Sequence, residues 1–220
     1  LITGGYGLLG ISLVNFFLRK KAKVVIFDYK KPTIRKKFFT QSKNLIIEKG
    51  NFVNFNNLVR IFKKHKFDGV FHLGAQTQVL KAYEKPYETF QTNVVGTLNL
   101  LEILKRQVIN IPLLYSSSDK AYGELQKNYY YEDDNLNAVF PYDASKSTSD
   151  LICQSYSKTY DMKVGIIRSA NIFGECDFNL QRIVPETVIS ILKNKQLKIR
   201  SSGKQKRDYI YVEDVCRAYY

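Results

Sequence analysis

The sequence contains few of the residues that build metal sites or disulfide frameworks: three cysteines, two histidines and one methionine among 220 residues, and no tryptophan. Cys153, Cys176 and Cys216 are odd in number, widely spaced and never in a C-x-x-C arrangement, so structural disulfides are not expected. His65 lies in a lysine-rich stretch and His72 within an apolar run, where a histidine is typically a hydrogen-bonded core residue rather than a ligand. We therefore predict no metal site, and unpaired cysteines favour a cytoplasmic location.

Long hydrophobic runs are also lacking: no stretch approaches the length of a membrane-spanning helix, and no internal repeat, low-complexity tract or linker interrupts the chain. The formal net charge of +14 suggests an anionic partner, but the basic residues are spread along the sequence, as in Arg19-Lys20-Lys21 and Lys63-Lys64. The sequence has neither a zinc module nor the interleaved aromatic and basic residues of RNA-recognition domains. We expect no membrane partner and no nucleic-acid partner, and the basic surface is suited to gathering a small anionic substrate.

Short apolar runs alternate with helical stretches along the whole chain. We expect strands at Leu1–Thr3, Lys23–Asp28, Asn44–Lys49, Gly69–Leu73, Pro112–Ser118 and Lys163–Ser169. We expect helices at Leu8–Arg19, Phe55–Lys64, Pro86–Arg106, Pro141–Tyr160, Arg182–Asn194 and Glu213–Tyr220. This alternation predicts an α/β fold with a doubly wound parallel sheet of the Rossmann type.

A glycine-rich turn follows the first strand. Gly4, Gly7 and Gly10 form a G-x-x-G-x-x-G pattern that leads directly into the first helix. Glycine at these positions permits a tight turn and the close approach of backbone to a pyrophosphate, and the N–H groups of a helix N-terminus favour an anion. We predict that Gly4, Gly7, Leu8, Leu9 and Gly10 bind the pyrophosphate of a dinucleotide.

Asp28 ends the second strand, 18 residues after Gly10. An acidic residue near this spacing accepts hydrogen bonds from an adenosine ribose, and its charge repels a 2′-phosphate. This favours NAD over NADP. The alternative is a glycine-rich loop followed by an unrelated aspartate at a strand end.

Tyr142 and Lys146 lie four residues apart, so on a helix they share a face. A neighbouring ammonium group and a nicotinamide cation would both favour the phenolate and bring tyrosine toward the range of a general base. Ser118 ends an apolar strand, where ligands of open α/β sheets gather. These three residues are candidates for catalysis, although the Tyr142–Lys146 spacing alone is equally consistent with a solvated helix face.

Four further motifs occur in order along the chain: F-H-L-G-A at 71–75, T-N-V-V-G-T at 92–97, R-S-A-N-I-F-G at 168–174 and R-D-Y at 207–209. Together with the glycine turn, Ser118 and the Tyr142–Lys146 pair, they resemble the extended short-chain dehydrogenase/reductase family, the NAD-dependent epimerases and dehydratases of sugar nucleotides. The resemblance covers essentially the whole chain.

The resemblance implies an NAD-dependent enzyme acting on a nucleotide-diphosphate sugar. Ser118 would polarise the sugar 4-hydroxyl, Tyr142 would remove its proton, and Lys146 would bind the nicotinamide ribose and lower the tyrosine pKa. Residues of the family pattern that would line the cofactor are Asn51, Phe52, Leu73, Ala75 and Asn93. Residues that would contact the substrate are Asn171, Arg182 and Arg207. Asn51 stands where the family commonly has aspartate, and Gly74 where it commonly has alanine; neither change is expected to abolish binding.

The resemblance also suggests a domain organisation. We expect an NAD-binding Rossmann domain at 1–170 and, at 171–220, the start of a substrate-binding region interleaved with it. The chain has no initiator methionine and ends within an expected helix, so we expect a piece truncated at both ends. Apolar positions on the helices at 86–106 and 141–160 suggest a homodimer through paired helices, as is typical of the family, although the sheet uses many of them.

The residues after Ser118 favour one reaction. Ser118-Asp119-Lys120 and the stretch 177–185 resemble CDP-glucose 4,6-dehydratases, in which C4 is oxidised, water is lost across C5–C6 and hydride returns to C6. By this resemblance Asp119 protonates the leaving hydroxyl, and Lys120 stands at the position of the base, which requires a lowered pKa. A C4 epimerase is the alternative, and Asp119-Lys120 is then a solvated turn. A non-catalytic NAD-binding sensor or scaffold is a further alternative, which intact Ser118, Tyr142 and Lys146 disfavour.

Overall fold

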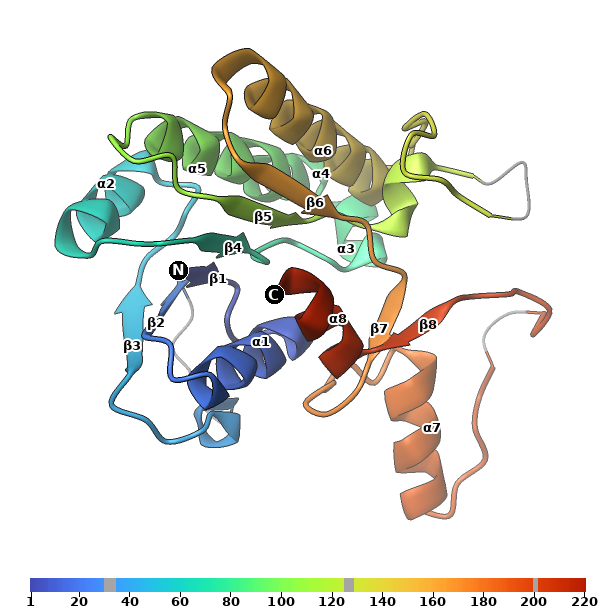
Figure 1. Ribbon diagram of the computed structural model, residues 1–220. Coiled ribbons are helices and arrows are strands. Elements are labelled where there is room, and N and C mark those ends of the chain that lie inside the picture. The colour runs from blue at the N-terminus through green and yellow to red at the C-terminus, as the bar shows by residue number, and fades with distance from the viewer. Residues whose placement is uncertain (30–34, 125–128, 200–201) are drawn as a thin grey trace.

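The computed structural model describes residues 1–29, 35–124, 129–199 and 202–220 (Figure 1). The six expected strands form one parallel sheet in the order β3-β2-β1-β4-β5-β6. Their bounds are β1 Ile2–Thr3, β2 Val24–Asp28, β3 Leu45–Lys49, β4 Val70–His72, β5 Leu113–Ser116 and β6 Val164–Ile167. The chain leaves β1 in one direction toward β3 and returns to β4 on its other side, so the strand order reverses between β1 and β4. Ligands of doubly wound sheets bind at the carboxyl ends of strands at this point.

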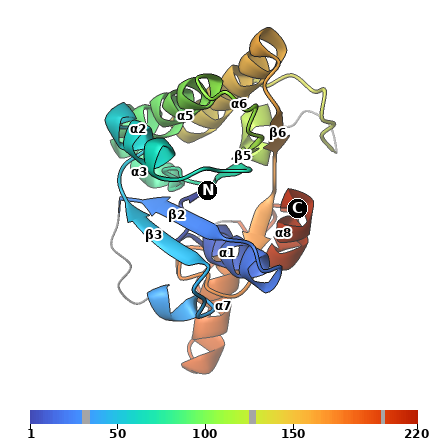
Figure 2. The same ribbon diagram turned by 60° about the vertical axis from the view of Figure 1, so that its left-hand side comes forward.

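Helices cover both faces of the sheet, as Figures 1 and 2 show. On one face lie α2 (Phe55–Lys64), α5 (Gly96–Lys105) and α6 (Pro141–Tyr160), and on the other α1 (Leu8–Arg19) and α8 (Val212–Tyr219). The inner strands are buried on both sides because each face has its own apolar core, one around Leu58, Leu101 and Leu113 and the other around Ile26 and Leu13. The predicted α/β doubly wound fold is confirmed.

The helix expected at 86–106 has an interruption that the sequence pattern did not indicate. It consists of α4 (Pro86–Phe90), a π-helical turn (Gln91–Val95) and α5, and a short helix α3 (Val79–Glu84) precedes it. Within the turn, the Asn93 carbonyl accepts hydrogen bonds from the Thr97 and Ser149 hydroxyls at 2.6 and 2.9 Å. These side chains provide the bonds that a regular helix would supply, which stabilises the wider turn.

A second, two-stranded parallel sheet was also not predicted. It pairs β7 (Asn171–Phe173) with β8 (Tyr209–Tyr211), and α7 (Ile183–Leu192) lies between them in the sequence. Figure 2 shows α7 projecting away from the large sheet, whereas α8 returns to pack against α1. Two 3₁₀ turns, Arg35–Phe38 and Asp119–Tyr122, complete the described elements. Of the helices in these parts of the chain, none is both long and apolar enough to cross a membrane.

Candidate cofactor site and active site

The glycine turn between β1 and α1 is closed by backbone. Gly4 has a φ of +67°, and a methyl group placed on it would lie 2.7 Å from the Cα atom of Gly74, in the segment after β4. A methyl group on Gly10 would collide with the Gly4 carbonyl oxygen. The Gly7 N–H donates to the same carbonyl at 3.0 Å. The turn therefore requires glycine at positions 4 and 10, which explains the spacing in the sequence.

The start of α1 fits an anion. The helix begins at Leu8, its N-cap is Gly7, and its first turn contains no acidic residue. The first N–H groups of a helix have no partner within it and lie at the positive end of its dipole. Leu8, Leu9 and Gly10 thus present backbone donors next to the tight turn, the arrangement that binds a pyrophosphate.

Asp28 lies at the carboxyl end of β2, beside β1, where it is half-buried. Burial and the nearby Asp28 carboxylate raise the pKa of Tyr6 to about 12, so Tyr6 of the glycine turn and Asp28 are close together. Arg35, a residue that the sequence motifs did not single out, donates to the Tyr6 carbonyl oxygen at 2.6 Å. A turn for a diphosphate and a carboxylate for a ribose thus lie at adjacent strand ends, and these residues fit an NAD-type dinucleotide.

Phe52 and Gly74 pack against each other, and this packing changes the role expected for Phe52. A methyl group at Gly74 would lie 2.6 Å from Phe52 Cε1 and 3.1 Å from the Thr3 hydroxyl, so the space left by the missing alanine is filled by the Phe52 ring. Phe52 is buried and packs edge-on against His72, with ring centroids 5.0 Å apart. Its side chain belongs to the core, which leaves only its backbone for a cofactor. The side-chain Oδ1 atom of Asn51 accepts a hydrogen bond from the Val53 N–H at 3.0 Å, in a local turn that stabilises the same loop.

Asn93 has a positioning role in this structure. Its side-chain amide donates to the Gln76 carbonyl at 3.0 Å and the Ser145 hydroxyl at 2.8 Å, and its oxygen accepts the Gln76 N–H at 2.8 Å. Because both amide hydrogens are used, Asn93 holds the segment containing Leu73 and Ala75 against α6 rather than offering a donor to a cofactor.

His72 is the core histidine that the sequence indicated. Its Nδ1 lies 2.7 Å from the Thr3 hydroxyl and its Nε2 lies 3.0 Å from the Thr97 hydroxyl. Burial, and to a lesser extent the charge of Lys146, lower the pKa of His72 to about 3, so the ring is neutral. Elsewhere in the described residues no group of three histidine, cysteine, aspartate or glutamate side chains is arranged to hold a metal ion.

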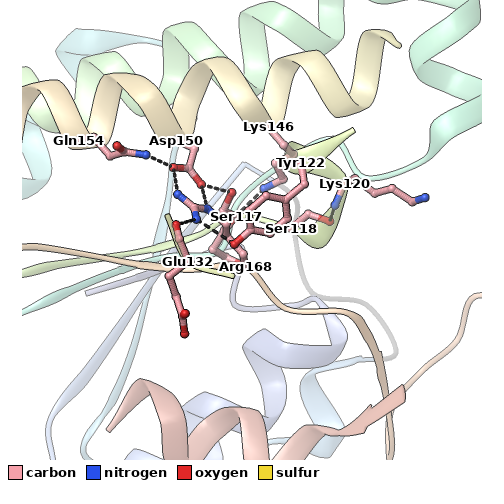
Figure 3. A network of polar contacts seen from close by, with 10 residues as sticks. Ser117, Ser118, Lys120, Tyr122, Glu132, Lys146, Asp150, Gln154 and Arg168 are labelled. Atoms are coloured by element: carbon pink, nitrogen blue, oxygen red, sulfur yellow. Dashed lines mark hydrogen bonds and ion pairs between the residues drawn. The ribbon is translucent and has the colours of Figure 1, made fainter. Parts of the chain in front are cut away.

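Ser118, Tyr142 and Lys146 come together at the carboxyl end of β5. The Lys146 ammonium is buried and donates to the Ser116 carbonyl oxygen at 2.6 Å (Figure 3). Burial lowers the pKa of Lys146 to about 8. Burial raises the pKa of Tyr142 to about 12, hydrogen bonding with Ser118 opposes this, and Asp119 and other charges act more weakly. The expected lowering relies on the charge of a bound nicotinamide as well as on Lys146.

Asp119 lies within this group rather than in an isolated solvated turn. It is half-buried and accepts a hydrogen bond from the Ser118 hydroxyl at 2.9 Å. Burial raises the pKa values of Tyr142, Tyr130 and Asp143, and the charge of Asp119 adds to each of these shifts. Asp143 was not singled out in the sequence: burial raises its pKa, and Lys120 opposes this. Asp119 and Lys120 directly follow Ser118, and Asp143 directly follows Tyr142, so groups able to act as acid or base flank both residues of the Ser118–Tyr142 hydrogen bond.

The three predicted substrate residues line one groove beside β7. Asn171, Arg182 and Arg207 border a pocket of about 270 Å³ together with Tyr209. Asn171 donates to the Asp208 carbonyl at 3.3 Å, and Arg182 pairs with Asp177 at 3.0 Å. Burial dominates the raised pKa of Tyr142, and the Arg182 charge opposes it only weakly.

Comparison with known proteins agrees with this arrangement. The sequence model of the NAD dependent epimerase/dehydratase family matches residues 1–220. The chain is 31% identical to a dTDP-D-glucose 4,6-dehydratase of Dictyostelium discoideum, with 100% of this chain and 54% of that protein covered. It thus spans about half the length of this relative.

Solved structures of the same kind share the fold. A dTDP-glucose 4,6-dehydratase of Bacillus anthracis in complex with NAD has a TM-score of 0.88 and 28% identity, over 99% of this chain and 68% of that one. A UDP-glucose 4-epimerase of Thermotoga maritima with UDP-glucose has a TM-score of 0.89 and 26% identity, over 99% and 70%. The family predicted from the ordered motifs is confirmed, and with it NAD as the family's cofactor. The chain belongs to the NAD-dependent epimerase/dehydratase family.

Proposed function

We propose that the protein is an NAD-dependent nucleotide-sugar 4,6-dehydratase. The observation that carries this proposal is the position of Asp119, which is hydrogen-bonded to Ser118 and adjoins Tyr142. An epimerase needs only a base that removes the 4-hydroxyl proton as hydride leaves C4 for NAD, whereas a dehydratase also needs an acid for the leaving hydroxyl. When bound, NAD supplies the reversible two-electron oxidation, and its positive nicotinamide favours the phenolate of Tyr142.

The residues divide the proton transfers among them. Ser118 orients the 4-hydroxyl of the sugar, and Tyr142 takes its proton. Oxidation at C4 acidifies the C5 proton, which a base can then remove while an acid protonates the departing 6-hydroxyl. We assign the acid to Asp119. Lys120 and Asp143 both adjoin it, and Asp143 extends the choice of base beyond the lysine that the sequence suggested.

The substrate we propose is a nucleoside diphosphate sugar, held in the groove beside β7. Arg182 and Arg207 supply positive charge and Asn171 an amide, which are groups that bind a diphosphate. The S-D-K sequence favours a cytidine nucleotide, by resemblance alone. A nucleotide-sugar C4 epimerase is the second candidate, because the similarity to the Thermotoga epimerase is as close as that to the Bacillus dehydratase.

We further propose the domain division at 170/171, a cytoplasmic location and a homodimer. The separate β7–β8 sheet beginning at Asn171 supports the division.

The dimer is supported by exposed apolar side chains on neighbouring helices. Helices α3 and α4 pack against α6, and the three helices expose Leu80, Tyr87 and Leu151, whose exposed fractions are 68%, 76% and 51%. Light scattering of the full-length protein tests the proposed dimer, and a monomer at micromolar concentration would exclude it.

The activity is tested by incubating the full-length protein and NAD separately with CDP-, GDP-, UDP- and dTDP-hexoses and measuring product mass. Loss of one water from one of these substrates supports the dehydratase. An unchanged mass with inverted stereochemistry at C4 supports the epimerase instead, and no conversion of any substrate argues for the sensor or scaffold.

A further inference from the structure

Arg168, just after β6, makes a bidentate ion pair with Asp150 on α6 (Figure 3). Its Nε and Nη2 atoms donate to the two carboxylate oxygens at 2.8 and 3.0 Å. Asp150 is completely buried and also accepts hydrogen bonds from Ser117 at 2.7 Å and Gln154 at 2.8 Å. A buried carboxylate bonded in this way is rigidly held, so Asp150 fixes the guanidinium plane.

The third guanidinium nitrogen of Arg168 donates hydrogen bonds to two other segments of the protein. Nη1 donates to the Tyr122 hydroxyl at 2.9 Å and to the Glu132 carbonyl oxygen at 2.6 Å. The guanidinium carbon also lies 5.0 Å from the centre of the Tyr122 ring. Tyr122 stacks on Tyr130, with ring centroids 4.4 Å apart and planes inclined by 10°. Arg168 thus joins α6, the 3₁₀ turn Asp119–Tyr122 and the segment 129–132.

These elements carry the two parts of the candidate catalytic set. Tyr142 and Lys146 lie on α6, and Lys146 is one turn before Asp150. Asp119 and Lys120 lie in the turn that ends at Tyr122, and Ser117, which donates to Asp150, precedes Ser118. The contacts of Arg168 therefore link the helix that carries the base of the first step with the turn that carries the acid of the second, although Arg168 contacts neither residue.

We propose that Arg168 is a positioning residue that, through buried Asp150 and the Tyr122 hydroxyl, fixes Asp119 and Lys120 relative to Tyr142 and Lys146. The catalytic consequence rests on the proposed function, but the positioning itself does not. A purely structural ion pair would stabilise the fold as a whole, whereas a positioning residue controls the local order of the turn.

The first test measures that local order by hydrogen exchange in the full-length protein. Tyr122→Phe removes the hydroxyl that accepts from Arg168 and leaves the Arg168–Asp150 pair and the ring stack intact. We expect the amides of Ala121 and Gly123, which close the turn onto Ser118 and Lys120, to exchange about 10-fold faster. Arg168→Lys keeps the positive charge but loses the planar guanidinium that binds Asp150 and Tyr122 together. We expect the exchange rates of the same two amides to increase about 100-fold.

The matched control is Tyr156→Phe on the same helix. It removes a phenol bond to Glu102 of 2.6 Å, away from the turn, and we expect exchange at 121 and 123 to stay at the wild-type rate. Unchanged exchange at these amides in Tyr122→Phe would overturn the proposal. So would equal acceleration throughout the chain, which indicates a general loss of stability.

The second test separates turnover from binding. With the sugar nucleotide identified as substrate, Arg168→Lys should lower kcat for water loss about 100-fold, the effect of a displacement of about 1 Å, while NAD affinity stays at the wild-type value. Tyr122→Phe should lower kcat less, and Tyr156→Phe should not change it. A raised KM at unchanged kcat would overturn the catalytic part. If the wild-type protein converts no sugar nucleotide, the proposed function fails, and the exchange measurement alone decides whether Arg168 orders the turn.

Discussion

The glycine turn after β1 and the groove beside β7 differ in the atoms that shape them. At the turn, backbone packs on backbone: a methyl on Gly4 would lie 2.7 Å from the Gly74 Cα atom. The groove is lined by side chains, most of them half-buried, and exposed Arg207 donates to the carbonyl of the residue before it at 2.8 Å. The shape of the turn is therefore set by backbone packing, whereas the groove is shaped by side chains, among them the charged Arg182 and Arg207.

The largest expected difference between the halves is catalytic. Tyr142→Phe removes the proposed base and should lower turnover about 10²- to 10⁴-fold, because a positioned general base contributes about that much. Arg207→Ala, in the open groove, should act mainly by raising KM for the sugar nucleotide. Steady-state kinetics of both variants, with NAD affinity measured separately, checks this. Equal losses of kcat in the two variants would contradict the distinction.

A pair of glycine substitutions compares the packed glycine turn with an exposed position at similar backbone strain. Gly4 and Gly203 have φ values of +67° and +73°. At Gly203 no other described atom lies within 4 Å of an added methyl group, so Gly203→Ala should destabilise the protein by about 1–2 kcal/mol through the backbone alone. Gly4→Ala should cost clearly more and abolish NAD binding. Denaturant unfolding of the full-length variants measures both, and equal changes would show that the turn is not closed by packing.

Asp28 tests the cofactor half by charge. Asp28→Ala should narrow the preference for NAD over NADP, since repulsion of a 2′-phosphate and lost ribose hydrogen bonds amount to about 1–3 kcal/mol. Calorimetric titration with both cofactors gives the difference. Equal affinity of the wild-type protein for NAD and NADP would contradict the role of Asp28.

The smallest expected effect concerns the dependence of stability on pH. Burial raises the pKa of Glu48, on β3, but hydrogen bonds from Lys64 and His65 dominate and lower it from 4.5 to about 2. Its carboxylate therefore stabilises the fold above pH 4.5, and this contribution is lost as the pH falls toward 2.

Glu48→Gln should thus remove about 1–2 kcal/mol of stability at pH 7, and the difference from the wild type should shrink in acid. Glu213→Gln is the control, because the Arg19–Glu213 pair is exposed. Urea unfolding at several pH values checks both variants. The same acid dependence in wild type and Glu48→Gln would contradict the assignment.

The sequence predicted the parts of the fold that depend on local pattern. The six parallel strands and the helices at 8–19, 55–64 and 141–160 follow from apolar periodicity, and the glycine turn follows from residues within one short segment. The β7–β8 sheet was missed because its strands have three residues each and lie 35 residues apart, too short and too distant for a periodic signal.

The candidate site shows the same limit. Ser118, Tyr142 and Lys146 were found from motifs, yet the contact between Lys146 and the Ser116 carbonyl joins residues 30 apart, and no spacing rule indicates it. The pKa of Tyr142 also depends on burial in the folded chain, which a local argument from neighbouring charges does not include. Asp143, beside a recognised motif residue, could have been found by asking which carboxylates share the first turn of α6.

The proposed dehydratase mechanism depends most on Asp119 as the acid, and a single-turnover experiment with Asp119→Asn tests this role directly. With substrate and NAD bound to the full-length protein, we predict that the sugar is still oxidised at C4. Reduced nicotinamide should therefore accumulate, which its absorbance measures. Loss of water, followed by mass spectrometry, should slow at least about 100-fold, as expected when a general acid is removed. Water loss at the wild-type rate, with no accumulation of reduced nicotinamide, would contradict the assignment of Asp119 as the acid.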